Sequence, residues 1–353
     1  MIRLRYLILI VPLIVIGVVV APQWSQWRTG RPAALPIALA PMEPHDVQPG
    51  RIWIDTDAAC GAMGRTDPDD CFAIAWLVAR GVDISGVSTS FGNAPGHVVA
   101  DRLAALFAQL DREGLSSPSM FVGYGAPATD RMPPPPGIAA LQSSLEEGPL
   151  TILALGPLTN IAAALNNRPD LQRNVTRIVS VMGHQPGHLF HPTEGNGRGA
   201  LFGHGPIFRD LNVSVDPEAT RRILEMSLPM TLVPYDAARS VLIDRADLDV
   251  LARQGSAGEW LAVSSQDWLD FWNDVVGLPG FYPFDWVAAA YLVEPASFAC
   301  AVVTARMTRQ WVFWLLPRDS LVVEQGHSEN PSHTRVLYCP KASLELHHVL
   351  ISH

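Results

Sequence analysis

From about residue 51 onward, short apolar segments alternate with helical stretches, and this alternation limits most strongly what the chain can fold into. The predicted strands lie at residues 52–54, 84–89, 121–123, 150–155, 177–182 and 230–233. Helices are predicted at residues 70–80, 97–110 and 158–165. Strands that alternate with helices indicate an α/β fold, a mostly parallel sheet flanked by helices. In such sheets, ligands bind at the carboxyl ends of the strands.

The composition agrees with this fold class and excludes others. Of the 353 residues, 48% are apolar and 17% are charged, which is typical of a globular protein and not of a coiled coil or a disordered chain. Asp and Glu number 34 against 25 Lys and Arg, so the formal net charge is −9. Because nucleic-acid-binding faces are basic, we expect no nucleic-acid partner. The four cysteines are too few to build a fold on disulfides.

The N-terminus predicts a targeting segment. Arg3 and Arg5 precede an apolar run that extends from Tyr6 to Ala21. At about 15 residues, the run lies between a signal-peptide core and a full membrane span of roughly 20 residues. Pro22 directly follows small residues that resemble a cleavage site, and it should hinder cleavage. This favours an uncleaved membrane anchor over a removed signal peptide.

The chain therefore divides into three predicted parts. Residues 1–21 form a signal anchor or signal peptide, which would place the rest on the periplasmic or extracellular side. Residues 22–50 contain six prolines and little periodicity, so they are expected to be a tether. The globular domain covers residues 51–353. If it is exported, a Cys60–Cys71 or a Cys300–Cys339 disulfide can form, but the sequence does not fix the pairing.

The densest group of chemically active side chains is an acidic loop directly after the first predicted strand. Within sixteen residues it carries five aspartates, Asp55, Asp57, Asp67, Asp69 and Asp70. Carboxylates this close repel one another unless they are protonated, solvated or share a cation. Oxygen ligands without His or Cys suit Ca²⁺ or Mg²⁺ and not Zn²⁺. The alternative is a solvated loop in which Asp70 caps the following helix.

Other polar side chains stand at the ends of predicted elements. Asn93 follows the second strand and is either a turn residue or a ligand contact. Asp285 begins an apolar helical run, where an N-cap is the simpler interpretation. Asp210 and Asn212 alternate with apolar neighbours, which predicts that they share one side of a strand-like segment. Asp216 precedes a proline, a pattern typical of a helix N-cap.

Taken together, these segments resemble the nucleoside hydrolase family of the inosine–uridine preferring type, Ca²⁺-dependent enzymes that cleave N-glycosidic bonds of ribonucleosides. The family's DTDPGxDD-like, VxGN-like, GPLTNIA, EFNxxxDPEAA and FDP-like motifs are matched, in that order, by residues 55–70, 90–93, 156–162, 210–219 and 284–285. The resemblance covers about residues 51–295. Any one motif is weak, but five in order are strong.

The resemblance implies a metal site. Asp57, Asp70 and Asp285 would bind Ca²⁺ through their carboxylates, and Leu155 through its main-chain carbonyl. Asp57 would also take a proton from the water that attacks the anomeric carbon. Carboxylates suit this reaction, because departure of the base leaves an oxocarbenium-like sugar.

The resemblance also implies a sugar site. The ribose hydroxyls and the 5′ end would be held by Asp69, Asn93, Asp210 and Asn212. Met182, at the end of the fifth predicted strand, would either line the sugar pocket or pack in the core. Asp55 would support the loop and not contact the substrate.

Two departures from the family pattern concern the metal and sugar sites. Eleven residues separate Asp57 from Asp69, where the family usually has three. This insertion could bulge outward, cover the pocket, or displace Asp69 and Asp70, since loop length itself adds little closure entropy. Asp210 stands where the family usually has Glu, so a ribose contact would need a shifted backbone or a water.

A third departure concerns protonation of the leaving base. Phe284 stands where the best-known members carry His, and phenylalanine cannot donate a proton. Candidate replacements, each of which could equally be an exposed loop residue, are His184, His188, His191 and His204. Other members stack the base between Trp rings, for which Trp268 and Trp272 are the natural pair. Their four-residue spacing also describes a buried helix face.

Two rival functions fit part of the sequence. A haloacid-dehalogenase-like phosphatase would use Asp55 and Asp57, but Asp69 and Asp70 come too early for its late acidic motif, and Lys341, the single lysine, lies in the tail. A non-catalytic, calcium-dependent riboside-binding protein at the membrane would keep the metal and sugar residues without an acid.

We expect a calcium-dependent hydrolase that releases ribose and base from a ribonucleoside or related riboside. The sequence does not identify the base. Beyond about residue 305 the family pattern fades, and residues 309–316 and 334–338 predict a C-terminal hairpin. Family members are commonly dimers or tetramers, so the resemblance also implies a homo-oligomer.

Overall fold

The computed structural model describes residues 37–41, 50–62, 64–129, 131–185, 210–312, 316–326 and 333–352. The predicted anchor at residues 1–21 and most of the predicted tether lie outside these residues. Among the described helices, none is both long enough and apolar enough to cross a membrane. Within the range expected to be a tether, Ala40–Pro41 form a short strand, β1, that pairs with the domain.

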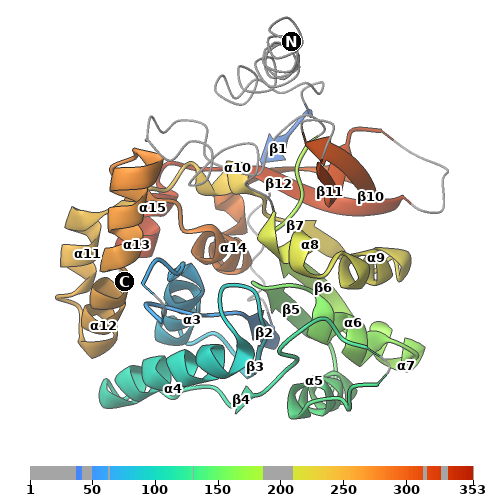
Figure 1. Cartoon of the computed structure of the whole chain (residues 1–353), viewed down its shortest axis with the longest axis horizontal. Coiled ribbons are helices and arrows are strands. Elements are labelled where there is room, and N and C mark those ends of the chain that lie inside the picture. The colour runs from blue at the N-terminus through green and yellow to red at the C-terminus, as the bar shows by residue number, and fades with distance from the viewer. Residues whose placement is uncertain are drawn as a thin grey trace, which may run out of the picture.

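A mixed sheet of ten described strands crosses the middle of the molecule (Figure 1). Its parallel part consists, in spatial order, of β4 (Met120–Phe121), β3 (Ile84–Thr89), β2 (Ile52–Thr56), β5 (Leu150–Ala154), β6 (Val175–Ser180) and β7 (Met230–Leu232). These strands lie within a few residues of their predicted positions. The expectation of a mostly parallel sheet flanked by helices is therefore confirmed.

The C-terminal part extends the sheet with antiparallel strands. It contains β10 (Phe298–Val312), β11 (Leu316–Glu324) and β12 (Thr334–Ala342). β12 joins the parallel part beside β7, and β10 pairs with both β11 and β12. The Cys300–Cys339 disulfide links β10 to β12. The predicted hairpin of residues 309–316 and 334–338 is wrong. Residues 309–312 of β10 pair with residues 316–319 of β11, and residues 334–338 of β12 pair with residues 301–305 of β10.

Helices cover both faces of the sheet (Figure 1). One layer holds α3 (Asp69–Ala79), α4 (Gly96–Arg112), α10 (Tyr235–Ala238), α11 (Arg245–Leu251), α12 (Ser256–Ser264), α13 (Gln266–Phe271), α14 (Phe284–Val293) and α15 (Leu346–Ile351). The other holds α5 (Pro136–Glu146), α6 (Thr159–Leu165), α7 (Pro169–Gln172), α8 (Leu211–Val215) and α9 (Pro217–Glu225). A π-helical turn (Trp272–Val276), a 3₁₀ turn (Pro295–Ser297) and a small pair of strands, β8 (Ile243–Asp244) and β9 (Gly280–Phe281), complete the described fold.

The central strand β2 shows why two layers form. Ile52 and Ile54 pack into the hydrophobic core on one face of the sheet, and Trp53 packs into the core on the other. Successive side chains of a strand point to opposite faces, so a strand that is apolar at every position must be covered on both sides.

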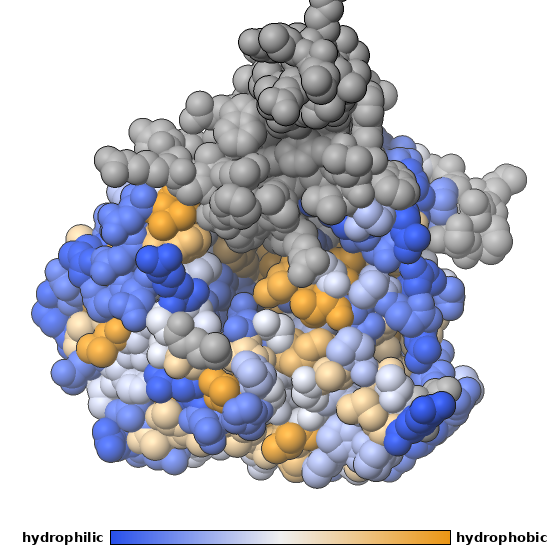
Figure 2. Space-filling model, in the orientation of Figure 1, coloured by the Kyte–Doolittle hydropathy of each residue, from blue (hydrophilic) through white to orange (hydrophobic). Residues whose placement is uncertain are grey.

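Polar residues dominate the outer surface over α11 and α12, whereas apolar residues gather near the centre of the face in Figure 2.

The helices α3 and α14 are the most deeply buried pair. From Cys71 to Val78 every residue of α3 is buried, and α14 is buried from Asp285 to Leu292. A helix that is apolar all round belongs in a core and not on a surface. The two helices contact each other through the stacked rings of Phe72 and Trp286, whose centroids lie 5.1 Å apart. This contact fixes the position of one helix start relative to the other.

We predict that Trp286→Ala lowers the free energy of unfolding by about 3–5 kcal/mol, because it leaves a cavity between α3 and α14. Urea denaturation of the purified chain measures the change. Leu344→Ala is the control, since Leu344 is 77% exposed and its removal should cost about 0.5 kcal/mol or less. Equal effects of the two substitutions would contradict this account of the helix pair.

Candidate active site

Four parallel strands deliver residues to one edge of the sheet. Asp57 follows β2, Asn93 follows β3, Leu155 follows β5 and Val181 follows β6. Because the strands are parallel, their carboxyl ends meet at the same edge. There they line a cavity of about 140 Å³, whose walls also hold Asp67, Asp69, Asp210, Leu211, Asn212, Trp268, Trp272, Phe284 and Asp285. The cavity lies where a parallel sheet is expected to bind its ligand.

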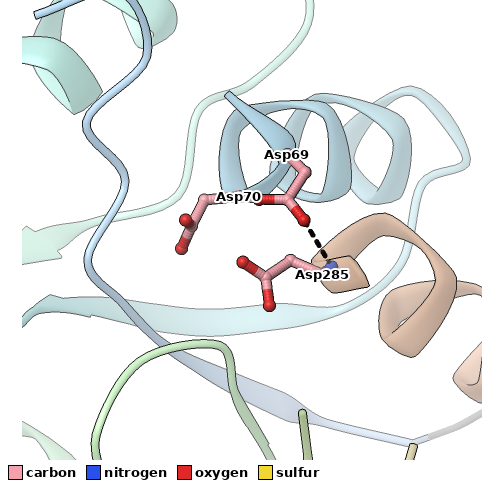
Figure 3. A group of neighbouring side chains, drawn as sticks. All are labelled: Asp69, Asp70 and Asp285. Carbon is pink, nitrogen blue, oxygen red and sulfur yellow. Dashed lines mark hydrogen bonds between the residues drawn. The ribbon is translucent and has the colours of Figure 1, made fainter. Parts of the chain in front are cut away.

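Three carboxyl groups meet at the starts of α3 and α14. Asp69 and Asp70 are the first residues of α3, and Asp285 is the second residue of α14 (Figure 3). One oxygen from each of the three groups can be chosen so that all lie within 4.8 Å of one another. The main-chain N–H of Asp285 donates a hydrogen bond of 2.8 Å to Asp69 Oδ2. The positive ends of both helix dipoles favour negative charge at this point.

These carboxyl groups are buried, and their mutual repulsion is strong. Asp69 is 1% exposed, Asp70 0% and Asp285 5%. Burial, followed by the charge of Asp69, raises the pKa of Asp70 to about 7. Burial also raises the pKa of Asp285 well above its ordinary value, and the charges of Asp69 and Asp70 add to the effect. Buried carboxylates this close are stable in the ionised form only when a cation is shared between them.

The donor set fits a divalent cation with oxygen ligands. No Lys, Arg or His side chain lines the cavity within the described part of the chain, although the charge of Arg318, outside these walls, partly offsets the burial that raises the pKa of Asp210. Carboxylate and carbonyl oxygens are the ligands of Ca²⁺ and Mg²⁺. Of the ligands expected from the sequence, Asp70 and Asp285 belong to the cluster of three and Leu155 lines the same cavity. Asp69, expected to bind the sugar, is the third member of the cluster.

Asp57 lies beside this cluster and is held by the turn after β3. The main-chain N–H of Asn93 donates to Asp57 Oδ2 at 2.8 Å, and the side-chain amide of Asn93 donates to Asp70 Oδ2 at 3.2 Å. Gly92 makes this approach possible, since a Cβ atom at that position would overlap Asp57 Oδ2. Burial, and then the charge of Asp70, raises the pKa of Asp57. Asn93 therefore links two acidic groups that the sequence assigned to the metal.

Asp55 lies behind the site and does not line it. Its carboxylate accepts hydrogen bonds from Ser88 and from the side-chain amide of Asn160, the latter at 2.7 Å. Asn160 also donates to the carbonyl of Thr89 at 2.9 Å and accepts from the N–H of Tyr124 at 2.8 Å. The network joins β2, β3 and α6, so Asn160 in the GPLTN stretch fastens the strand ends in register.

The strand-like segment predicted at Asp210 and Asn212 is wrong, because these residues start the short helix α8. Asp210 is its N-cap, and its carboxylate accepts from the N–H groups of Val213 at 3.2 Å and Gly183 at 2.8 Å. Local capping by a side chain of this kind favours a helix start even where polar and apolar residues alternate. Both residues nevertheless line the cavity. Asp216, in contrast, caps α9 as predicted, accepting from Ala219 N at 3.0 Å.

Asn212 connects two of the strand ends. Its side-chain amide donates to the carbonyl oxygen of Leu155 at 2.8 Å and to that of Val181 at 3.0 Å. A carbonyl oxygen has two lone pairs, so Leu155 keeps an acceptor position for a cation. Met182, the next residue after Val181, is fully buried in the core that α6 and α9 cover, and it is not among the described residues lining the cavity.

The insertion after Asp57 leaves the acidic cluster in place. The Cys60–Cys71 disulfide links the insertion to α3, and Arg102 Nε donates a hydrogen bond of 2.7 Å to the carbonyl oxygen of Cys60. Its end places Asp67 in the cavity wall, where the carboxylate accepts from Asp69 N at 3.3 Å. Asp67 is a site residue that the sequence analysis did not assign. Its position directly before Pro68 and two aspartates was the available signal.

Three aromatic rings form another wall of the cavity, from Trp268, Trp272 and Phe284. The ring centroids of Trp268 and Trp272 lie 6.1 Å apart, and those of Trp272 and Phe284 lie 6.5 Å apart. Trp272 is only 2% exposed, which confirms the buried helix face. It also borders the cavity, and its contact with a base stays a prediction.

Of the histidines proposed as acids, His184 is the one within the described residues. It is buried, and its main chain is hydrogen-bonded to β11 through Leu321 O and Val323 N. The structure does not describe His188, His191 or His204.

Residues 52–339 match the family model for inosine–uridine preferring nucleoside hydrolases. The pyrimidine-specific ribonucleoside hydrolase RihA of Enterobacter sp. (strain 638) is 29% identical over 155 residues, 42% of this chain and 44% of that protein. RihA of Citrobacter koseri is 26% identical over 189 residues, 52% of this chain and 54% of that protein. The chain thus spans about half the length of the curated relatives it matches.

Solved structures share the fold. A plant nucleoside hydrolase, PpNRh1, aligns with a TM-score of 0.66 at 19% identity, over 86% of this chain and 98% of that structure. The purine-preferring ribonucleoside hydrolase from Gardnerella vaginalis aligns with a TM-score of 0.62 at 18% identity, over 85% of this chain and 96% of that structure.

We predict that the double substitution Cys60→Ser and Cys71→Ser lowers the free energy of unfolding by about 2–4 kcal/mol, because the insertion is then no longer covalently linked to α3. It should also weaken divalent-cation binding, because Cys71 directly follows Asp70 and the insertion carries Asp67. Calorimetric titration with Ca²⁺ measures the binding. Cys300→Ser with Cys339→Ser is the matched control, since that disulfide joins β10 to β12. A cation affinity weakened equally by both pairs would refute the link between the insertion and the site.

Proposed function

The chain belongs to the inosine–uridine preferring nucleoside hydrolase family, and on that premise we propose that it hydrolyses the N-glycosidic bond of a ribonucleoside or related riboside. The products are ribose and the free base. The observation that carries the proposal is the cluster of Asp69, Asp70 and Asp285, buried beside Asp57 in a cavity at the carboxyl ends of the strands. Structural and sequence relatives named for purine and for pyrimidine nucleosides leave the base open.

Calcium is the proposed cofactor. Asp57, Asp70 and Asp285 would hold the ion with their carboxylates, and Leu155 with its main-chain carbonyl. When bound, such a cation orients the sugar hydroxyls and lowers the pKa of a water molecule. The support for a cation is the buried, all-oxygen donor set with no basic side chain among the described lining residues.

The protein groups then have distinct tasks. Asp57, held by Asn93, accepts the proton of the attacking water. The water oxygen bonds to the anomeric carbon while the bond from that carbon to the base nitrogen breaks. Buried carboxylates stabilise the positive charge that develops on the sugar. Asp69, Asn93, Asp210 and Asn212 would bind the ribose.

A non-catalytic riboside-binding protein is the second candidate. Phe284 favours it, since this ring lines the cavity and cannot protonate a leaving base. Catalysis and binding alone make different demands on Asp57, because only turnover requires a base.

We also propose that the domain is exported and held at the membrane by residues 1–21, and that it forms a homo-oligomer. Two disulfides, Cys60–Cys71 and Cys300–Cys339, support an oxidising compartment for the domain. Fractionation of cells that express the full chain, with and without residues 1–21, tests the location.

We predict that Asp57→Ala lowers kcat for ribose release by at least about 100-fold, the ordinary contribution of a general base. Free ribose is measured for a panel of purine and pyrimidine nucleosides, with Ca²⁺ and with a chelator. Asp274→Asn is the control, because Asp274 is exposed outside the cavity. Calcium-dependent binding of ribosides without any turnover would contradict the hydrolase function and support a riboside-binding function.

We predict that Ca²⁺ affinity is about tenfold weaker near pH 6 than near pH 8. The pKa of Asp70 is raised from 3.8 to about 7, so below that pH a proton competes with the cation. The same shift means that the cation-free folded state loses stability as pH rises through about 7, since the unfolded state holds this proton less tightly. Calorimetry in two buffers of different ionisation enthalpy counts the protons released, and equal affinity at both pH values would contradict the prediction.

A further inference from the structure

Resting on the proposed hydrolase function, we propose that the preferred substrate is a riboside whose heteroaromatic base carries a positive charge, and that Asp67 and the wall of Trp268, Trp272 and Phe284 select for it. Bases of this class are rings alkylated or ribosylated so that a ring nitrogen is cationic, such as a pyridinium or an N7-alkylated purine. The proposal names the substrate class of the site already described.

The charge of the cavity favours a cation beyond the metal. Its described walls hold five aspartates, Asp57, Asp67, Asp69, Asp210 and Asp285, and Asp70 adjoins them. One divalent ion offsets two of these charges, and Arg318 acts on the charge of Asp210. Asp67 comes from the insertion within the first family motif, and it adds a carboxyl group to the site. Burial and the charge of Asp69 raise the pKa of Asp67, and a cation bound beside it favours its ionised form. In a buried site a positively charged base gains from this excess, and an anionic substituent such as a phosphate is repelled.

The aromatic wall suits the same ligand. Tryptophan is the strongest partner for a cation placed over a ring face, and Phe284 adds a third ring. The three rings line the cavity together, so they fit a flat, cationic ring.

The chemistry of departure removes the need for an acid. A neutral base that leaves with the bonding electron pair becomes an anion unless a proton reaches it. A cationic base takes the same electron pair into its positively charged ring through the glycosidic nitrogen and leaves as a neutral molecule. The water oxygen bonds to the anomeric carbon, and the water proton goes to Asp57, so charge and atoms balance. Phe284 is compatible with this reaction although it cannot donate a proton.

A hydrogen bond and a disulfide hold Asp67 in the wall of the cavity. Its oxygen accepts the N–H of Asp69 at 3.3 Å, and the disulfide from Cys60 to Cys71 closes the insertion around it. Arg65, the basic residue of the insertion, lies over the Phe271 ring, with its guanidinium carbon 5.8 Å from the ring centroid, and does not line the cavity. The insertion thus presents its acidic side chain to the ligand.

The test compares matched substrates with the full chain loaded with Ca²⁺. N7-methylguanosine and nicotinamide riboside supply cationic bases, and guanosine and uridine supply neutral ones. We expect a higher kcat/KM for the cationic pair. Because such bases also leave faster without an enzyme, the decisive quantity is how a substitution changes the ratio of kcat/KM for N7-methylguanosine to that for guanosine. Intrinsic reactivity cancels from that change.

Asp67→Asn should lower this ratio about tenfold, the size of one charge-assisted contact, mainly through KM for the cation. Asp274→Asn removes an exposed carboxylate outside the cavity and should leave the ratio unaltered. Phe284→His should raise kcat for guanosine more than for N7-methylguanosine, since it supplies an acid that the neutral base alone requires.

Two results overturn the proposal. Neutral nucleosides hydrolysed as efficiently as cationic ones, or a ratio that Asp67→Asn changes no more than Asp274→Asn, would refute the substrate class while leaving the hydrolase function intact. Absence of ribose release from all four substrates would refute both.

Discussion

The structure depends on holding several buried carboxyl groups close together. The helices α3 and α14 are apolar beyond their first two residues and pack side by side in the core. Asp69 and Asp70 begin α3, and Asp285 is the second residue of α14. The packing of the two helices brings Asp69, Asp70 and Asp285 within reach of a single ion. Burial of like charges is unfavourable, whereas burial of the surrounding apolar side chains contributes about 1.5–3 kcal/mol for each large one. The helix core therefore stabilises an arrangement that the carboxyl groups alone would oppose.

The parallel sheet supplies the rest of the site through one geometric rule. Strand ends at one edge converge, so short segments far apart in the chain meet without long connections. A second layer of hydrogen bonds keeps these ends in register: Asp55 and Asn160 behind β2, and Asn212 between Leu155 and Val181. Polar networks of this kind rigidify the groups they join, although Asp55 Oδ2 has no hydrogen-bond partner among the described residues.

The sequence predicted those parts of the fold whose signal is local. Hydrophobic runs located β2, β3, β5, β6 and β7, and the order of the motifs brought Asp57, Asn93, Leu155 and Asp285 to one cavity. It failed at Asp210 and Asn212, where two-residue alternation suggested a strand but side-chain capping started a helix. Alternation over so few residues does not outweigh a cap that satisfies main-chain N–H groups.

Other features depended on contacts that no local pattern contains. The place of Asp67 follows from the path of the insertion, which the Cys60–Cys71 disulfide and the bond from Arg102 to Cys60 determine. Whether Met182 faced the sugar or the core depended on which way the chain turns after β6. Side chains with two plausible environments are resolved by packing alone, and packing is the information a single sequence carries least directly.

Asp67 and Phe284 both make the site better suited to a positively charged base than to a neutral one. Phe284 occupies a position where the family's best-known members have a proton donor, and Asp67 adds an acceptor of positive charge to the same cavity. Each change alone would weaken hydrolysis of a neutral nucleoside, since the first removes an acid and the second adds unpaired negative charge to a buried site. Residues that reduce local stability without an internal compensation are characteristic of functional sites, where the ligand supplies the missing partner. The partner that would offset both changes is a positively charged base.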